Sequence, residues 1–255
     1  MTPAGAARAS GRLLRIGALA AETLARASLL GRAGEAGPGL LRARTELFAS
    51  ASRRALAVHG LDIRCTGAAP PGPALVVVNH LSYLDPLVVA TAVACVPVSK
   101  ADLASWPLFG AVARSTGVLF VTRDSASSRR RVMDEAEGAL AAGVRVLNFP
   151  EGTTSDGATV LPFRRGMFGV AQRLGIPVLP LGLTYDPPWL AWVGEATFVP
   201  HYLRFAALAR PVVRVTIGVP IPARAYLDPQ ALADAARGRV VELLSERPEW
   251  LRKTR

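Results

Sequence analysis

From about residue 60 onward, short runs rich in β-branched residues alternate with stretches of helical character. ALVVVNH is followed by PLVVATAVACV, GVLFVTR, SSRRRVMDEAEGALAAG and VRVLNFP, and later by IPVLPLGLTY and VVRVTIGVPI. This alternation favours a mixed, largely parallel sheet with helices packed on it. Asp228 and Pro229 indicate the start of a C-terminal helix, and residues 186–210 read as a longer connection with several aromatic residues. We therefore expect an α/β fold whose main domain covers residues 57–255.

The first 56 residues have a different composition, biased toward alanine and arginine. Arg12, Arg15, Glu22 and Arg26 recur at three-, four- and seven-residue steps, so they share one helical face while apolar residues occupy much of the rest. These charges interrupt every apolar run before it reaches the ~20 residues that a membrane-spanning helix needs. A second arginine-bearing helical stretch follows a Gly-Pro-Gly break. We predict a pair of amphipathic helices in residues 1–56 that docks on the cytoplasmic face of a membrane, and the alternative is a pair that only packs on its own domain.

The chain has 255 residues and a formal net charge of +11, mostly from arginine. Such a charge suits an anionic partner, which can be a membrane surface, a nucleic acid or a phosphorylated substrate. Because the aromatic residues do not interleave with the basic ones as a stacking platform requires, we expect no nucleic-acid partner. Cys65 and Cys95 form neither a metal-ligand spacing nor a disulfide framework, which indicates a reducing compartment. The absence of a G-x-S-x-G elbow, a Walker A loop and a G-x-G-x-x-G fingerprint argues against serine hydrolases and nucleotide-dependent enzymes.

His80, one of three histidines, lies just beyond the strand-like run ALVVV in the segment NHLSYLDP. An imidazole at the carboxyl end of a strand lies where open α/β sheets bind ligands. Asp85, five residues later, could accept a hydrogen bond from Nδ1–H and leave Nε2 free to take a proton. Ser82 and Asp85 also fit an S-x-x-D capping box, which needs no catalytic role. We predict that Asp85 both helps to start the helix and orients His80.

A second strand-like run leads into a loop rich in Gly, Thr and Ser, VRVLNFPEGTTSDG, over residues 144–157. The backbone N–H groups and hydroxyls of such a loop can hold an anionic head group. Arg164 and Arg165 lie close to this loop in sequence, and Arg123 ends a strand-like run of its own. Together these segments predict one site with a base, a carboxylate, an anion-binding loop and several arginines.

This combination resembles the glycerolipid acyltransferase family, of the lysophosphatidic acid acyltransferase type. Asn79 and the following HLSYLD look like the family's NHxSxxD motif, GVLFVTR like its GxxFxxR motif, FPEGTTS like its FPEGTxS motif, and IPVLP like its proline-bearing fourth motif. SKADL and FRRG are similar to the family's K-x-E-L and FKKG stretches, with Asp102 in place of the glutamate. The motifs follow one another in the family's order over residues 79–180.

The resemblance implies an O-acyltransferase of phospholipid biosynthesis. His80, held by Asp85, would act as general base on the hydroxyl of a lysophospholipid such as 1-acylglycerol-3-phosphate, which attacks the thioester of acyl-CoA or acyl-carrier protein. The resemblance implies neither a metal nor a prosthetic group, and it makes anionic membrane lipids, the lysolipid and the acyl carrier the expected partners. The residues that it implies around the acceptor head group are Lys100, Arg123, Glu151, Gly152, Thr153, Thr154, Ser155, Arg164 and Arg165.

One position departs from the family pattern. Members that use lysophosphatidic acid commonly have arginine where this chain has Thr154, and a guanidinium binds phosphate in a bidentate manner that a hydroxyl cannot reproduce. Members that acylate other lysolipids, including lyso-ornithine lipid, can carry EGTTSDG-like sequences, and residues 151–157 read EGTTSDG. An acceptor without a phosphomonoester is therefore the first alternative. A basic peripheral membrane-binding protein without catalysis is the second.

Overall fold

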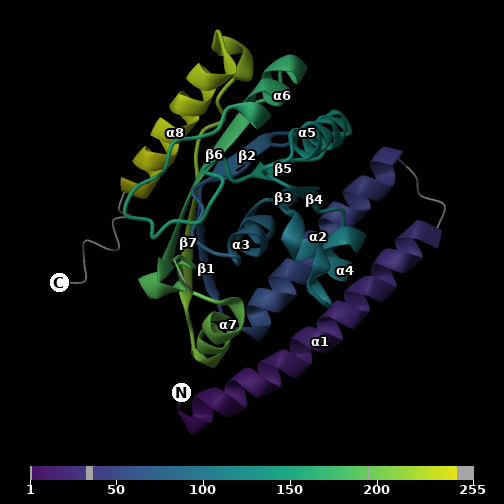
Figure 1. The fold of residues 1–255 in the computed structure, drawn as a ribbon, viewed down its shortest axis with the longest axis vertical. Helices are drawn as coiled ribbons and strands as arrows, with labels where there is room; N and C mark the ends of the chain where they lie inside the picture. Colours follow the sequence, from purple (N-terminus) through teal and green to yellow (C-terminus); the bar gives the residue numbers. More distant parts are fainter. Residues whose placement is uncertain (1, 33–36, 195, 246–255) are drawn as a thin grey trace.

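The computed structural model describes residues 2–32, 37–194 and 196–245. Within these residues a single sheet has the strand order β1-β7-β6-β2-β5-β3-β4 (Figure 1). Neighbouring strands are parallel, apart from the antiparallel pair β6 and β7. The strands are β1 (Asp62–Thr66), β2 (Leu75–Val78), β3 (Val96–Lys100), β4 (Leu119–Val121), β5 (Val146–Asn148), β6 (Val178–Asp186) and β7 (Val212–Ile217). The predicted α/β class, with a mixed and largely parallel sheet, is confirmed.

Helices cover both faces of this sheet, because its central strands are apolar on both sides. In β2, Val76 and Val78 belong to a core shared with α2, α3 and α7, whereas Leu75 and Val77 belong to a core shared with α5, α6 and α8 (Figure 1). The helices are α1 (Pro3–Arg32), α2 (Gly37–Val58), α3 (Asp85–Ala92), α4 (Phe109–Ser115), α5 (Ala126–Ala141), α6 (Gly166–Leu174), α7 (Phe198–Ala207) and α8 (Pro229–Ser245), with short 3-10 helices η1 (Ala101–Ser105), η2 (Pro188–Leu190) and η3 (Ala223–Ala225).

The strand order brings the predicted motifs together. β2, β5, β3 and β4 are consecutive neighbours in the sheet and run parallel, so their carboxyl ends meet at one edge. His80 follows β2, the loop of residues 149–157 follows β5, Lys100 ends β3, and Arg123 follows β4. Segments that are far apart in the sequence therefore supply side chains to the same edge, where open α/β sheets bind ligands.

Residues 186–210 contain helix α7, which the sequence did not indicate. Pro200 interrupts the sequence pattern, but it is the third residue of the helix, where a backbone N–H has no intrahelical partner to lose. Phe205 and Ala206 of this helix are fully buried in the core around β6 and β7. The connection is therefore a structural element that closes one face of the sheet.

Helix α1 packs on the domain through a side that combines Arg12 with small and apolar residues such as Ala9, Leu19 and Ala20. Arg12 is 8% exposed, and its guanidinium donates to the carbonyls of Val58 at 3.0 Å, Ala206 at 2.9 Å and Leu208 at 2.5 Å. These carbonyls lie at the C-terminal ends of α2 and α7, where backbone acceptors have no intrahelical donor. The opposite face of α1 is exposed and carries small and apolar side chains, namely Ala7, Gly11, Leu14, Ala18, Ala21, Ala25 and Leu29.

The two N-terminal helices thus share the core of the main domain, to which α2 contributes Phe48 and Leu56. The division into residues 1–56 and 57–255 stays a prediction. Among the described residues, no helix is both long and apolar enough to cross a bilayer.

Candidate active site

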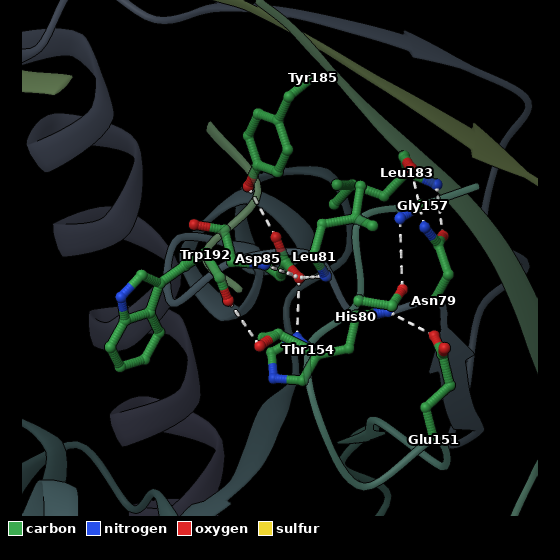
Figure 2. A network of polar contacts seen from close by, with 12 residues as sticks. Asn79, His80, Leu81, Asp85, Glu151, Thr154, Gly157, Leu183, Tyr185 and Trp192 are labelled. Carbon is green, nitrogen blue, oxygen red and sulfur yellow. Dashed lines mark hydrogen bonds and ion pairs between the residues drawn. The ribbon is translucent and has the colours of Figure 1, made fainter. Parts of the chain in front are cut away.

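His80 lies in the turn between β2 and α3, close to the carboxylate of Asp85 (Figure 2). The Oδ2 atom of Asp85 accepts hydrogen bonds from His80 Nδ1 at 2.8 Å and from the N–H groups of Leu81 at 2.6 Å and Ser82 at 2.9 Å. Asp85 is fully buried, so these donors replace the water that an ionised carboxylate needs. The turn therefore holds the imidazole and the carboxylate in a fixed relation.

The predicted capping box in this turn is wrong. The N-cap residue of α3 is Leu84, without a side-chain cap, and Asp85 N–H donates at 3.1 Å to the backbone carbonyl of Ser82 rather than to its hydroxyl. The buried Ser82 hydroxyl has no partner among the residues described. Because the Asp85 carboxylate turns back toward Leu81 and Ser82, it stabilises the turn before the helix. Pro86, in the first helical turn, is the residue suited to starting the helix.

The imidazole of His80 is also held by stacking. Its ring lies 4.0 Å from that of Phe149, with an angle of 25° between the planes. Since Nδ1–H donates to Asp85, the tautomer places the lone pair on Nε2. The side chain of His80 is 14% exposed and lines a cavity. A ligand in this cavity can therefore reach the imidazole, whose Nε2 is free to accept a proton.

Glu151 lies behind His80 and outside the cavity lining. Its Oε1 accepts the backbone N–H of His80 at 2.7 Å, and its Oε2 accepts that of Leu161 at 2.9 Å. Burial raises the pKa of this carboxyl, while the two backbone donors and the nearby His80 oppose the rise. The family resemblance implied contact with the acceptor head group, but in the structure both carboxylate oxygens accept backbone N–H groups, Oε1 that of His80 and Oε2 that of Leu161. The same loop donates a third link, from Ser155 N–H to the His80 carbonyl at 2.8 Å.

Sequence reasoning did not identify Asn79 and Tyr185 as positioning residues. Tyr185 belongs to β6, and Asn79 contacts that strand. Asn79 exchanges a pair of hydrogen bonds with the backbone of Leu183, both at 2.9 Å, which fixes the end of β2 against β6 (Figure 2). Tyr185 donates its hydroxyl to Asp85 Oδ1 at 2.8 Å. Asn79 is adjacent to His80 in the motif and so could have been found, whereas nothing in the sequence near Tyr185 links it to Asp85.

Thr154 contacts a wall of the site instead of facing the cavity with a free hydroxyl. Its Oγ1 donates to the carbonyl of Trp192 at 2.6 Å, and Trp192 N–H donates to the carbonyl of Leu81 at 2.7 Å (Figure 2). The Trp192 ring then meets Tyr83 edge to face, with centroids 5.5 Å apart. Trp192 is thereby held beside the turn that contains His80, and nothing near Trp192 in the sequence indicates this contact.

The cavity has a volume of about 490 Å³ and a mixed lining. Its apolar wall includes Val98, Val121, Val132, Met133 and Met167. Its predicted site residues are His80, Lys100, Arg123, Gly152, Thr153, Thr154 and Arg164. Asp85, Glu151, Ser155 and Arg165 lie outside this lining, and Arg165 is an exposed residue at the start of α6. The structure therefore brings most of the predicted residues to one cavity. Asp85, Glu151 and Ser155 lie behind it, where they bind the side chain or backbone of His80.

The cations of the cavity differ in their surroundings. Lys100 pairs with Asp102. Partial burial lowers the pKa of Arg123, and the neighbouring guanidinium of Arg164 lowers it further, while Asp102 and Asp124 act in the opposite direction. An anionic ligand near Arg123 and Arg164 would relieve this repulsion.

Gly152 allows Arg164 to approach the loop. Its φ is +75°, and a Cβ added there would lie 2.8 Å from Arg164 Nε. Any larger residue at this position would therefore strain the backbone and displace the guanidinium. The glycine of the EGTTS segment serves the geometry of Arg164 as well as that of the loop.

Comparisons with known proteins agree with this site. The family model described as Acyltransferase matches residues 58–184. A lyso-ornithine lipid O-acyltransferase of Rhizobium meliloti is 30% identical over 76% of this chain and 73% of that protein. A 1-acyl-sn-glycerol-3-phosphate acyltransferase alpha of Mus musculus is 30% identical over 74% of this chain and 66% of that protein.

A solved structure has the same fold. The 1-acyl-sn-glycerophosphate acyltransferase PlsC of Thermotoga maritima superposes with a TM-score of 0.61 at 20% identity, over 80% of each chain. The resemblance inferred from the motifs is confirmed by these matches. The chain belongs to the acyltransferase family.

Proposed function

We propose that this chain is a lysolipid O-acyltransferase with His80 as its general base. The observation that carries the proposal is the His80–Asp85 pair in the wall of a cavity that also contains Arg123, Arg164 and Lys100. The relatives named as lysolipid acyltransferases support it. The co-substrate would be an acyl thioester, carried by coenzyme A or by acyl-carrier protein.

The reaction follows from the tautomer of His80. Nε2 removes the proton of the acceptor hydroxyl while that oxygen attacks the carbonyl carbon of the thioester. The tetrahedral intermediate collapses with cleavage of the C–S bond, and the imidazolium returns the proton to the leaving thiolate. Asp85 stabilises the imidazolium between these steps. A base of this kind accelerates a reaction by roughly 10² to 10⁴-fold, and the steps use only this chain and its two substrates, without metal or prosthetic group.

The first acceptor to consider is 1-acylglycerol-3-phosphate. Arg164 is close enough to Arg123 to lower the pKa of its guanidinium, and a phosphomonoester between the two would gain charge-assisted hydrogen bonds. Lys100 adds a third cation, which Asp102 partly neutralises. Thr153 and the backbone after Gly152 would complete the head-group site.

A second acceptor class is favoured by Thr154. Its hydroxyl is used by the Trp192 carbonyl, so it offers the head group neither a charge nor a free donor. A lysolipid whose head group carries less negative charge than a phosphomonoester, such as lyso-ornithine lipid, needs fewer cations. Four relatives named as lyso-ornithine lipid acyltransferases support this possibility.

We propose further that α1 docks on the anionic cytoplasmic face of a membrane with its outward stripe. Leu14 and Leu29, at 78% and 62% exposure, are the largest side chains of that stripe. Since Arg12 binds carbonyls of the domain and Glu22 pairs with Arg54, the inner side of the helix is already occupied. The net charge of +11 would add attraction to anionic lipid.

A second apolar surface beside the cavity would reach the same membrane. Leu108, Phe109 and Val199 are 38%, 45% and 61% exposed. Phe198 joins them, because its ring lies 6.1 Å from that of Phe109 and 4.4 Å from that of Trp106. Trp106 lines the cavity, so this apolar rim offers an acyl chain a path from the bilayer to His80. α1 contacts α4 and α7, the helices that carry the rim.

The proposal is tested by supplying the full chain with a radiolabelled acyl-CoA or acyl-carrier-protein donor and either 1-acylglycerol-3-phosphate or lyso-ornithine lipid. We expect a diacyl product, and we expect His80→Ala to lower its rate at least about 100-fold. A parent protein that acylates neither acceptor with either donor, or an equally active His80→Ala variant, would place the chain among non-catalytic membrane-binding proteins.

Thr154→Arg distinguishes the two acceptor classes. A guanidinium at this position should improve kcat/KM for the phosphate acceptor relative to lyso-ornithine lipid by about tenfold or more. If the parent already prefers 1-acylglycerol-3-phosphate and Thr154→Arg leaves the ratio unchanged, the second acceptor class is excluded.

A further inference from the structure

Tyr185 reaches the catalytic pair from the far end of β6. This strand pairs with β2 as far as Leu181 and then continues beside β7 to Asp186. Because alternate residues of a strand face the same side, Leu183 and Tyr185 follow Leu181 over the turn that contains His80. Tyr185 is 7% exposed, and its hydroxyl points at Asp85 (Figure 2).

The two oxygens of Asp85 have unequal surroundings. Oδ2 accepts from His80 Nδ1 and from two backbone N–H groups, whereas the donor at Oδ1 is the Tyr185 hydroxyl at 2.8 Å. Water cannot take the place of this hydroxyl easily, since Asp85 is fully buried. Without Tyr185, one oxygen of a buried carboxylate would lose its donor, which is costly.

We infer that Tyr185 is a positioning residue for acyl transfer: its hydroxyl binds Asp85 Oδ1, keeps Oδ2 directed at His80, and favours the charge state in which His80 can accept a proton. This inference rests on the proposed function and deepens it. Tyr185 acts through Asp85, and it does not line the cavity.

The phenol is suited to this task because it remains a donor. Burial raises the pKa of Tyr185 well above its usual value, and the neighbouring Asp85 and Tyr83 raise it further. The other titratable groups around the pair are Glu151 behind His80 and His201 of α7, whose Nδ1 lies 3.1 Å from the Tyr83 hydroxyl.

The Tyr185 hydroxyl should change proton binding by the His80–Asp85 pair in one direction. The active pair, an ionised Asp85 with a neutral His80, carries one negative charge, and the protonated pair carries none. The Tyr185 hydroxyl draws negative charge away from the Asp85 carboxylate, which weakens the attraction of that carboxylate for a proton on His80 and so favours the negative form of the pair. Its removal makes the pair take a proton at higher pH, so the acidic limb of the rate profile moves upward.

The test is Tyr185→Phe in the full chain, which removes the hydroxyl and keeps the ring. With radiolabelled acyl-CoA and the acceptor that the parent uses, we expect kcat to fall about tenfold while the acceptor KM stays within about twofold. The acidic limb of kcat/KM should move up by roughly 0.5 to 1 pH unit. An unchanged limb would overturn the inference even if kcat falls, because a loss of packing lowers the rate at every pH alike.

Tyr202→Phe is the matched control. Tyr202 is also buried, and its hydroxyl lies 3.0 Å from His59 Nε2, in a contact of α7 that does not involve the catalytic turn. This variant should lose a comparable hydrogen bond without moving the acidic limb. A shift of equal size in both variants would show that the limb reports general loosening, and the inference would fail.

A second readout does not require turnover. Diethyl pyrocarbonate modifies neutral imidazole, so the extent of His80 modification against pH, measured by peptide mass spectrometry, gives a midpoint for the pair. We expect this midpoint to be higher in Tyr185→Phe than in the parent. If the parent acylates neither acceptor, the proposed function fails, but a shifted midpoint still supports the contact between Tyr185 and the pair. An unchanged midpoint refutes the inference whatever the activity.

Discussion

Both carboxylate oxygens of Glu151 accept backbone hydrogen bonds, Oε1 from His80 N–H at 2.7 Å and Oε2 from Leu161 N–H at 2.9 Å. Glu151→Gln keeps the shape and replaces one acceptor by an NH₂ group, which then faces a donor. We expect the free energy of unfolding to fall by about 1–3 kcal/mol, because one buried N–H loses its acceptor. We also expect kcat to fall with little change in acceptor KM, since the backbone at His80 shifts. Urea unfolding and steady-state kinetics measure the two effects.

Arg123→Gln is the control for this prediction, because Arg123 lines the cavity and Glu151 does not. Loss of its charge should raise the acceptor KM more than it lowers kcat. If Glu151→Gln also raised KM and left kcat unchanged, Glu151 would be a head-group ligand, as the sequence motif implied.

The sequence predicts some of these residue contacts better than others, for a physical reason. His80 and Asp85 are five positions apart, so a turn into a helix brings them together by local geometry alone. Tyr185 is 100 residues from Asp85, and only the strand order places it over the turn. The capping interpretation of Ser82 failed because the same short spacing fits two uses of one carboxylate.

At the scale of elements, α1 buries Arg12 among small and apolar residues, leaves Arg15 and Arg26 exposed, and carries a stripe of small and apolar residues on its outward side. A pattern of charges identifies an amphipathic helix, but it does not say which side the protein covers, because buried arginines can bind the ends of other helices. Arg12 does so at α2 and α7. The outward stripe follows from this arrangement and could not be read from the spacing alone.

Leu14→Asp tests the docking of that stripe. A carboxylate on the lipid-facing side should prevent flotation with vesicles that contain anionic phospholipid, with little effect on stability because Leu14 is 78% exposed. Val241→Asp is the control, since Val241 is 38% exposed on α8, on the opposite face of the sheet (Figure 1). Equal flotation of both variants would contradict docking through α1.

Leu108 in the rim supplies a second variant for the same assay. It has φ 65° and ψ −54°, and Phe109 N–H donates to the Pro107 carbonyl at 2.7 Å, so it is the central residue of a classic γ-turn. This conformation is strained for leucine and accessible to glycine. Leu108→Gly should therefore raise stability by up to about 1 kcal/mol, yet weaken vesicle binding. Thermal unfolding and flotation would then change in opposite directions, whereas a leucine without a membrane role would change only the first.

At the scale of the whole molecule, the alternation of apolar runs was sufficient to predict the α/β class, because buried parallel strands need continuous apolar sequence. It was not sufficient for α7, where Pro200 and the aromatic residues resemble a loop although the helix is buried through Phe205 and Ala206. Nor does a pattern give the strand order. The neighbours β2, β5, β3 and β4 turn four separate motifs into one site, and that adjacency depends on long-range packing.

The packing of the N-terminal helices on the domain should make stability depend on pH. His59 follows α2, and its Nδ1 lies 2.8 Å from the Ala55 carbonyl while its Nε2 lies 3.0 Å from the Tyr202 hydroxyl of α7. Burial, and then Arg12, lowers its pKa below the usual 6.5, against the effect of the Ala55 carbonyl. The folded state thus keeps His59 neutral to a lower pH than the unfolded chain, which binds a proton as the pH falls through 6.5.

We therefore expect the contribution of His59 to the free energy of unfolding to be complete above pH 6.5. Below that pH the contribution should fall, by at most about 1.4 kcal/mol per pH unit for one histidine. Glu151, whose pKa burial raises, acts with the opposite sign above pH 4.5, and His201, whose pKa burial lowers, acts with the same sign as His59. His59→Gln isolates the contribution of His59, because glutamine can make polar contacts but does not titrate. Urea unfolding at pH 5.5 and 7.5 should show a smaller difference in the variant than in the parent. The same difference in both proteins would mean that folding does not lower the pKa of His59, and that the contact between α2 and α7 does not depend on a neutral imidazole.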